Sequence, residues 1–528
     1  MSKYIYMKFL QIILLLAVPV SAEVSLPSLF SDGMVLQRQK PIRVWGKGEN
    51  GEGLTVTFRD ESVKATVENG GWMAVLKPCE AGGPYVLKIT SDKSNISFKD
   101  VLVGDVWICG GQSNMEAAIA NSDTKEQAMA VAANPNIRYF TQSFDGHPKL
   151  QDDVKNGKWK KDGQNNDRKY FSAIAWHFSQ KILEYENVPL GFIKTWKGAS
   201  HAQFWLPIED IKGDPRFEEY VKEYETKVAA FDVLKAEYEK QIAEKKKPSQ
   251  RPHTWVAAFA FNQMIYPMRH FGVKGVLWYQ GESNSSFNGA IIYEELMTRV
   301  IKAWRKNFND ENLPFLSVQL SSFAGYSSTP NNQNWAILRE AQENVAKKLP
   351  HTGIALSFDH GEIKNIHPKA KRPVGERLAL IALNKVYGKD VEYLGPYFSK
   401  VEIKNDKIVV SFDNIGKGIT TSDGKNPKSF YISAEDNVFY PAEATIEKET
   451  IILRCDKVKT PKHVRYGWLN YVEANLYGKN GLPVPPFRSD NLPHQKNDYY
   501  PENPMRKYYP KDGAKSSLDE SESEDATP

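Results

Sequence analysis

The sequence predicts an α/β protein in which a doubly wound parallel sheet is flanked by an N-terminal and a C-terminal β unit. With 528 residues, the chain is longer than one ordinary hydrophobic core requires. Between residues 101 and 390, short apolar runs alternate with patterns of helical periodicity. Residues 23–100 and 391–490 instead consist mainly of short runs with the composition of strands. Because alternating strands and helices are typical of a parallel sheet covered on both faces, we expect such a sheet in the central unit.

The first 22 residues have the pattern of a secretory signal peptide. Lys3 and Lys8 precede the apolar run FLQIILLLAV, and a stretch of small residues ends at Ala22. The apolar run is shorter than the ~20 residues that span a membrane, although a retained anchor is the alternative. We therefore expect cleavage near Ala22 and an exported protein, periplasmic or secreted, with no membrane attachment after cleavage.

The two flanking units are predicted from short runs of strand-like residues. In residues 23–100 these runs are separated by Gly, Asn and Asp, which predicts a small β-sandwich. Residues 391–490 predict a second β unit, with the runs KIVVSFDN, SFYISAEDN, ATIEKETIILRC and HVRYGW. The chain then becomes rich in charged residues, Pro and Ser and ends in DESESEDATP, so residues 491–528 are predicted to be disordered.

The central unit, residues 101–390, is predicted from apolar strands that alternate with helices. The expected strands are DVWIC, GFIKTW, VKGVLWY, PFLSVQL and GIALSF. Residues 210–250 are expected to be a helical insertion, whose apolar stripe predicts a helix pair that packs on the central unit rather than a partner-binding arm. Ligands of doubly wound sheets bind outside the carboxyl ends of the strands, so reactive side chains are expected there.

Composition and charge exclude several classes of function. Hydrophobic residues make up 41% and charged residues 25%, as in most soluble globular proteins. The formal charge of +5 is small beside 69 basic and 64 acidic residues, and no basic run is interleaved with aromatic residues, so no nucleic-acid partner is expected. Cys79, Cys109 and Cys455 are widely spaced and allow at most one disulfide. Since no zinc-binding motif is present, we expect neither a metal nor an organic cofactor.

Ser113 is the first candidate for a reactive side chain. The predicted strand DVWIC runs into GGQSNME, so Ser113 follows two glycines that permit a tight turn, and Gln112 and Asn114 flank it. A serine at such a turn can expose its hydroxyl group and lie beside backbone N–H groups that point at a developing oxyanion. The alternative is a serine that merely caps the following helix.

A serine hydroxyl becomes a good nucleophile only when a base accepts its proton, so a histidine is expected nearby. His367 lies in the loop FDHGEIKNIHPKAKRPVGERLAL, which follows the last predicted strand of the central unit. His360, in the same loop, is the alternative base, and an ordinary surface histidine is the alternative role for either.

Two further turns at predicted strand ends carry polar groups or glycine. The segment VKGVLWYQGESN places Gln280, Glu282 and Asn284 after a strand, where a side-chain amide could donate to an oxyanion. In GFIKTWKGASHAQFW, Gly198 follows another strand, and its backbone N–H can approach a substrate oxygen closely. Each could be an ordinary turn, but the convergence of four such turns on one sheet edge favours a catalytic site.

These motifs together resemble the sialate O-acetylesterase family of SGNH hydrolases. The resemblance covers nearly the whole mature chain, and the pair GQSNM and WYQGESN is highly specific. Further matching segments are LPSLFSDGMVLQR, WAILREAQ, NIHPKAKRPVGERLA, RYGW and NLYGKNGLPVPPFRSD. The resemblance implies an SGNH-type, flavodoxin-like sheet and a serine esterase that removes O-acetyl groups from sialic acids through an acetyl-enzyme intermediate.

The resemblance also implies a role for each motif residue. Ser113 would be the nucleophile and His367 its base. The oxyanion hole would consist of the N–H groups of Ser113 and Gly198 and the side chain of Gln280. Gln112, Asn114 and Glu282 would support the site, and Glu282 would hold its loop rather than transfer a proton.

Two segments depart from the pattern of the family. Many relatives have an acidic residue two or three positions before the histidine, but Lys364 and Asn365 occupy these positions. The imidazole could instead be oriented by Asp359, Glu362, Asn365 or a backbone carbonyl, and we favour a Ser-His dyad. The segment ASHAQFW also replaces the GTPAEAW of many relatives, so the wall beside Gly198 is expected to differ.

The substrate implied by the resemblance is an O-acetylated sialic acid or sialoglycan. The alternatives are acetyl groups on xylan or another polysaccharide and, in a different class, a non-catalytic carbohydrate-binding protein. Because sialic acid carries a carboxylate, its recognition favours an Arg or Lys near the pocket, and Arg339 is a candidate.

Overall fold

The computed structural model describes residues 23–247, 255–324 and 333–495. The predicted signal peptide and nearly all of the predicted disordered tail lie outside these ranges. Within these ranges, no helix is both long and apolar enough to cross a membrane.

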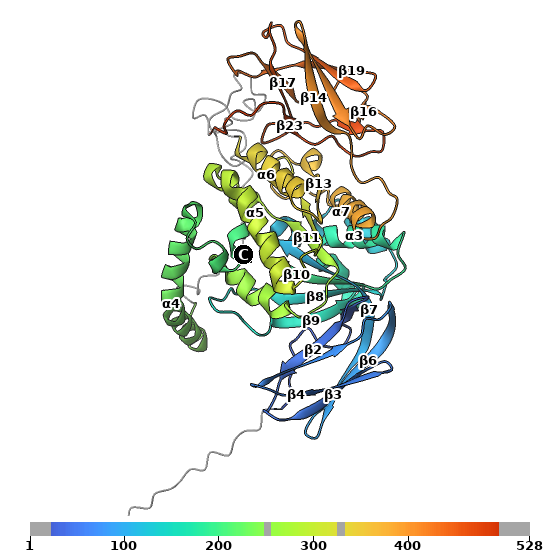
Figure 1. Ribbon diagram of the computed structural model, residues 1–528, viewed down its shortest axis with the longest axis vertical. Coiled ribbons are helices and arrows are strands. Elements are labelled where there is room, and N and C mark those ends of the chain that lie inside the picture. Colours follow the sequence, from blue (N-terminus) through green and yellow to red (C-terminus); the bar gives the residue numbers. More distant parts are fainter. Residues whose placement is uncertain (1–22, 248–254, 325–332, 496–528) are drawn as a thin grey trace, which may run out of the picture.

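A mixed seven-stranded layer forms the centre of the molecule, with the strand order β13-β12-β11-β7-β10-β8-β9 (Figure 1). The six strands other than β9 run parallel to one another, whereas the edge strand β9 is antiparallel to β8, so the predicted parallel sheet is mixed at one edge. The bounds are β7 (Asn95–Gly111), β8 (Ile137–Ser143), β9 (Lys155–Lys161), β10 (Leu190–Trp196), β11 (Gly275–Tyr279), β12 (Phe315–Val318) and β13 (Thr352–Ala355).

The strand order reverses at β7. Strands β10 and β8 lie on one side of β7, and β11, β12 and β13 follow on the other. If β8 and β9 at one edge are left out, the remaining strands can be numbered 1 to 5 in chain order. Their order across the sheet is then 2-1-3-4-5, which is the flavodoxin-like order. In such sheets the ligand crevice lies at the carboxyl ends of the strands where the order reverses, so the end of β7 is the expected place for a site.

Apolar strands and two pairs of helices build the central core. All five residues of β11 and the last eleven of β7 are buried, as expected for parallel strands covered on both faces. Helix α3 packs against α7, and α5 packs against α6, and these pairs flank the sheet (Figure 1). The helix bounds are α1 (Ser113–Glu116), α2 (Lys125–Ala130), α3 (Ala173–Leu183), α5 (Phe287–Phe308), α6 (Asn334–Lys348) and α7 (Arg372–Lys385).

The N-terminal β unit is joined to the central sheet by a continuous strand. The first part of β7 pairs antiparallel with β6, and its last residues pair parallel with β10 and β11. Residue 100, where the sequence places a domain boundary, therefore lies inside a strand of 17 residues. The other strands are β1 (Val35–Gln37), β2 (Ile42–Lys47), β3 (Gly53–Phe58), β4 (Glu61–Thr66), β5 (Gly71–Leu76) and β6 (Gly82–Ser91).

The C-terminal β unit packs on the opposite end of the central unit (Figure 1). It contains two four-stranded sheets and one two-stranded sheet. A single hydrophobic core runs through all three units. The strands are β14 (Tyr397–Lys404), β15 (Lys407–Asp413), β16 (Ile419–Thr421), β17 (Phe430–Ser433), β18 (Tyr440–Pro441), β19 (Glu443–Glu447), β20 (Thr450–Arg454), β21 (His463–Tyr466), β22 (Leu476–Gly478) and β23 (Phe487–Arg488).

The helical insertion contains one long helix, α4 (Glu218–Ala243), instead of the predicted helix pair. Its only buried residue is Phe231, which packs with Val256 and Phe259. Val233 and Ile242 are 73% and 51% exposed, so most of the helix lies at the periphery (Figure 1). The apolar spacing identified the helix but overstated how much of it is buried.

Candidate active site

Ser113 and His367 meet at the carboxyl end of β7. The Nε2 atom of His367 lies 2.8 Å from the Oγ atom of Ser113, which is hydrogen-bonding distance. Ser113 is the first residue of α1, and only Gln112 separates it from the end of β7. Gly111 permits this turn, because its φ is +121° and a Cβ atom at this position would lie 2.0 Å from the carbonyl oxygen of Tyr279 on β11. The glycine pair thus lets β7 end close beside β11 with the serine at the edge of the sheet.

The surroundings of His367 favour its neutral form. Partial burial lowers the pKa of His367, and the neighbouring Lys371 ammonium lowers it further, while the Glu116 carboxylate acts in the opposite direction. The imidazole is therefore neutral at neutral pH and can accept a proton from Ser113.

Asn365 and Glu362 hold the backbone of the histidine loop. The side chain of Asn365 accepts a hydrogen bond from the N–H of His367 at 3.0 Å and donates to the carbonyl of His367 at 2.9 Å. Asn365 also donates to Glu362 at 3.1 Å, and Glu362 accepts from the N–H of Lys369 at 2.7 Å. Both predicted orienting residues therefore act on the main chain that carries His367, not on its imidazole.

Asp359 and His360 lie together in a different cluster. The carboxylate of Asp359 accepts hydrogen bonds from Arg377 at 2.7 and 2.6 Å and from Tyr477 at 2.7 Å. His360 Nε2 lies 3.4 Å from the same carboxylate. The structure thus contradicts Asp359 as the orienting acid and His360 as the base. In the described part of the chain, no carboxylate is hydrogen-bonded to the imidazole of His367.

Gly198 lies beside the serine. A Cβ atom built on Gly198 would be 3.8 Å from the Cβ of Ser113 and 3.5 Å from a carboxylate oxygen of Glu116. Across residues 23–247, 255–324 and 333–495, no acceptor is found for the backbone N–H of Ser113 or of Gly198. These two groups can therefore donate to an oxygen atom bound next to the Ser113 hydroxyl.

The side chain of Gln280 is used in a buried network, which contradicts its predicted role as an oxyanion donor. Its Nε2 donates to Asn284 at 2.8 Å, to the carbonyl of Ser200 at 3.1 Å and to Gln112 at 3.2 Å. Its Oε1 accepts from the hydroxyl of Tyr293 at 2.9 Å. Since the side chain is fully buried and every polar atom has a partner, Gln280 holds the loops instead of facing a substrate.

Gln112 and Asn284 extend this network to the loops after β7, β10 and β11. Gln112 accepts hydrogen bonds from the N–H groups of Gly281 and Ser283, each at 3.3 Å. Asn284 accepts from the N–H of Ala202 at 2.9 Å. The network therefore fixes the loop of Gly198 relative to that of Ser113.

Asn114 connects the serine turn to the histidine loop. Its side chain donates to the carbonyl of Ile366 at 2.9 Å and to Glu282, and it accepts from the ammonium of Lys371. Burial raises the pKa of Glu282 and lowers the pKa of Lys371 to about 8. Because Ile366 precedes His367, Asn114 helps set the distance between the two reactive side chains.

A cavity of about 640 Å³ opens in front of Ser113 and His367. Aromatic side chains form much of its wall, and its charged lining consists of Lys160, Lys194 and Lys371 against one carboxylate, Glu116. The motifs did not single out Glu116 or Lys194, although a lysine within the apolar strand GFIKTW is a signal that could have identified the second. Arg339, predicted as a carboxylate ligand, is instead fully buried and donates to the carbonyl groups of Gly467, Leu469 and Asn470.

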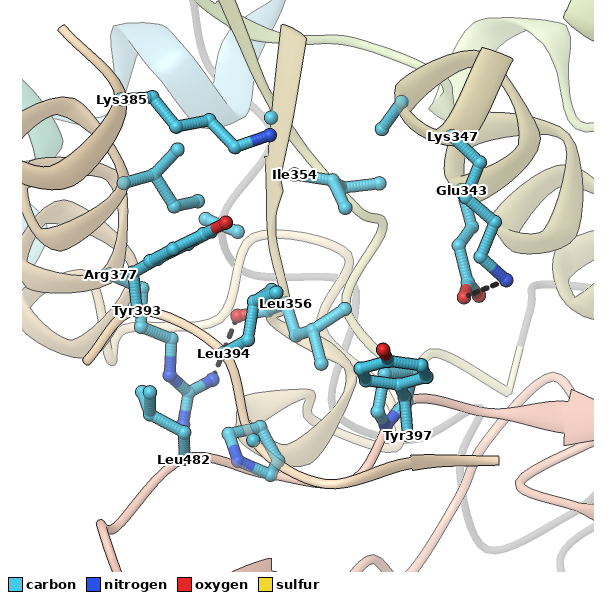
Figure 2. Close-up of a pocket in the computed structure, with 17 residues that line it drawn as sticks. Glu343, Lys347, Ile354, Leu356, Arg377, Lys385, Tyr393, Leu394, Tyr397 and Leu482 are labelled. Carbon is cyan, nitrogen blue, oxygen red and sulfur yellow. Dashed lines mark hydrogen bonds and ion pairs between the residues drawn. The ribbon is translucent and has the colours of Figure 1, made fainter. Parts of the chain in front are cut away.

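A second cavity, of about 360 Å³, lies beside β13 at the junction with the C-terminal unit (Figure 2). Ile354, Leu356 and Leu394 form part of its apolar wall, and the Glu343–Lys347 ion pair lies at one side. None of the predicted catalytic residues lines it. Of these two cavities, only the first is lined by Ser113 and His367.

The chain is similar to known proteins over most of its length. Residues 249–384 match the model of a family described as carbohydrate esterase, sialic acid-specific acetylesterase. Sialate O-acetylesterase of Mus musculus is 27% identical, covering 87% of this chain and 93% of that protein, and the Homo sapiens protein is 28% identical, covering 87% and 91%. The crystal structure of a carbohydrate acetylesterase from Xanthomonas citri superposes with a TM-score of 0.78 at 33% identity, covering 89% of this chain and 100% of that one.

The fold, the site and these similarities define a carbohydrate esterase. Within this class, the chain belongs to the sialate O-acetylesterase family, which confirms the family predicted from the sequence motifs.

Proposed function

We propose that the protein removes O-acetyl groups from sialic acids, with Ser113 as nucleophile and His367 as base on an SGNH-type fold. The 2.8 Å contact between Ser113 and His367, at the wall of a cavity with three lysines and one carboxylate, carries this proposal. A Ser-His pair is suited to ester hydrolysis, and a cationic cavity is suited to a sugar acid. The names of the Mus musculus and Homo sapiens relatives support the choice of sialic acid.

Two half-reactions follow from the geometry. His367 Nε2 accepts the hydroxyl proton while Ser113 Oγ attacks the acetyl carbonyl carbon, and the N–H groups of Ser113 and Gly198 stabilise the oxyanion. The bond to the sugar oxygen breaks, and His367 returns the proton to that oxygen. Water then attacks the acetyl-serine with His367 as base, which releases acetic acid and restores the serine hydroxyl. The reaction consumes one water per ester and uses no cofactor.

We propose that the pair works as a dyad. Hydrogen bonds from Asn365 and Asn114 position the backbone of the histidine loop, so the imidazole is directed by the main chain that carries it. Loss of one oxyanion donor in such sites costs about 3 kcal/mol of transition-state stabilisation, so the two backbone donors account for a large share of the expected rate.

A second candidate substrate is an acetylated neutral polysaccharide such as xylan. The Xanthomonas citri relative, which has the higher identity, is named only as a carbohydrate acetylesterase. Aromatic side chains in the cavity wall, including Tyr139, Phe171 and Trp196, could stack against a neutral sugar.

Acetate release distinguishes these candidates. The purified mature protein and its Ser113→Ala variant are compared on 9-O-acetylated N-acetylneuraminic acid, acetylated xylan and p-nitrophenyl acetate. Release from the sialic acid that is lost in Ser113→Ala supports the proposal, whereas release from xylan alone keeps the chemistry and changes the substrate. A protein inactive on all three would be a carbohydrate-binding protein.

We also propose that the enzyme is exported and consists of an N-terminal β unit (23–100), a catalytic domain (101–390) and a C-terminal β unit (391–490). The basic and apolar pattern of the first 22 residues supports export. N-terminal sequencing of the protein from its native host is expected to begin near Glu23, and a chain that begins at Met1 would contradict it.

A further inference from the structure

Lys194 is an unusual residue for its place in the fold. It lies in β10, next to the central strand β7, and pairs with Cys109 in the sheet register. The other six residues of β10 are buried, whereas Lys194 is partly exposed and lines the cavity together with Phe192 and Trp196. A lysine in a central parallel strand requires an explanation, because lysine is almost never buried unless it is paired.

The three cavity lysines differ in their partners. Lys160 forms an ion pair with Asp167 at 2.9 Å, and Lys371 donates to the side chain of Asn114. For Lys194, no carboxylate lies within ion-pair distance of the ammonium anywhere in the described ranges. Its described contact is with the ring of Trp196, whose centre lies 5.5 Å from Nζ.

The charge of Lys194 is therefore poorly compensated. Burial lowers the pKa of Lys194, and the more distant Glu116 carboxylate only partly opposes this effect. A half-buried cation without an anionic partner is destabilising to the folded protein, and binding an anion from solution would relieve this cost.

We propose that Lys194 binds the carboxylate of the substrate and thereby makes the enzyme selective for acetylated sugar acids over neutral acetylated sugars. This inference rests on the proposed function, since it assigns a recognition residue to the same site. Glu116 lies beside Gly198 and repels an anion, so the carboxylate of the sugar acid is expected at Lys194 and away from Glu116. Lys194 is a specificity residue and takes no part in the bond-breaking steps.

A matched pair of substrates tests this assignment. The first is 9-O-acetylated N-acetylneuraminic acid, and the second is its carboxamide, in which a neutral amide replaces the carboxylate. The wild-type enzyme is expected to favour the carboxylate by about tenfold or more in kcat/KM, since a charge-assisted hydrogen bond in a partly buried site is one of the stronger polar contacts. Lys194→Met is expected to abolish this preference through KM, and Lys194→Arg to retain most of it.

Two controls separate recognition from a structural effect. Lys160→Met removes a cavity lysine that is already paired, and it is expected to keep the preference for the carboxylate. Hydrolysis of p-nitrophenyl acetate, which has no carboxylate, is expected to be similar in wild type and Lys194→Met. Equal losses on both sialic acid substrates and on p-nitrophenyl acetate would overturn the inference and show that Lys194 only supports the fold.

The result also distinguishes this inference from the function on which it rests. Wild-type protein that hydrolyses p-nitrophenyl acetate but neither sialic acid substrate would overturn the proposed substrate and, with it, the inference. Wild-type protein that hydrolyses both with no preference, or a preference that persists in Lys194→Met, would leave the sialate esterase standing and overturn the role of Lys194 alone.

Discussion

Two sets of polar side chains lie behind and in front of the same sheet edge, and they differ in how their hydrogen-bonding groups are used. Behind the serine, the amide groups of Gln112, Gln280 and Asn284 are buried and satisfied by one another and by the backbone. In front of it, Ser113 and His367 contact each other at the wall of an open cavity. The comparison teaches that position at a strand end does not by itself make a residue reactive, because the same edge also needs residues that fix its loops.

The histidine loop repeats this contrast within a few residues. Asp359 and His360 belong to a cluster with Arg377 and Tyr477, whereas His367 contacts the serine. The Asp359 cluster joins the central unit to the C-terminal unit, whereas His367 is available for chemistry. The following predictions use substitutions that separate the two sets.

The largest effect is expected from removal of either reactive side chain. Ser113→Ala and His367→Ala are each expected to lower kcat/KM by about a thousandfold or more. The reason is that the serine attacks the ester efficiently only when the histidine accepts its proton. The free energy of unfolding is expected to change by less than about 0.5 kcal/mol, since both lie at the cavity surface. His360→Ala is the matched control and is expected to retain activity; comparable loss in that variant would mean that the base was misassigned.

Asp359→Asn is expected to act mainly on stability. It leaves the buried Arg377 charge without a compensating carboxylate, and breaking such a pair typically costs about 3–5 kcal/mol. Denaturant unfolding measures this loss, and activity per folded molecule at low temperature is expected to stay within a few-fold of wild type. Normal stability combined with lost activity would instead identify Asp359 as a member of a catalytic triad.

Gln280→Met is expected to give an intermediate result. The change removes the hydrogen bonds to Asn284 and to the carbonyl of Ser200 and the one from the hydroxyl of Tyr293, and a buried group left unsatisfied in this way costs about 1–3 kcal/mol. The loss in kcat is expected to be smaller than the 10²–10³-fold that follows removal of an oxyanion-hole donor. A larger loss in kcat with unchanged thermal unfolding would place the Gln280 amide in the oxyanion hole.

The smallest effect is expected in the pH dependence. Because burial and Lys371 lower the pKa of His367, the base stays neutral to lower pH, and the acid limb of kcat/KM is expected below about 6.5. Glu116 opposes this shift, so Glu116→Gln is expected to move the limb to still lower pH by a few tenths of a unit. An acid limb above 6.5, or a shift of the opposite sign in Glu116→Gln, would contradict the described electrostatics.

The sequence predicted the parts of the fold and site that depend on local pattern. Apolar runs located β7, β10, β11, β12 and β13, and the strand-end motifs located Ser113, Gly198 and His367, which the structure brings together. Strands β8 and β9 were not predicted: β9 is a lysine-rich edge strand, KNGKWKK, without the apolar pattern of a buried strand.

The direction of individual side chains could not be predicted, because it depends on distant parts of the chain. The Gln280 amide is held within the buried network because Tyr293 on α5 and Gln112 after β7 complete its hydrogen bonds. Arg339 is buried against the C-terminal unit by carbonyl groups about 130 residues later in the chain. Lys194 became a candidate only when β8, β10 and α1 together defined a cavity.

Covalent labelling tests the central claim most directly. The protein is treated with diisopropyl fluorophosphate, a reagent for activated serine hydroxyls, and the modified residue is located by peptide mass spectrometry. We expect one adduct per chain, on Ser113, with parallel loss of p-nitrophenyl acetate hydrolysis and no adduct in His367→Ala. Inactivation with the adduct on another residue, or labelling of Ser113 that does not require His367, would contradict a Ser113–His367 catalytic pair.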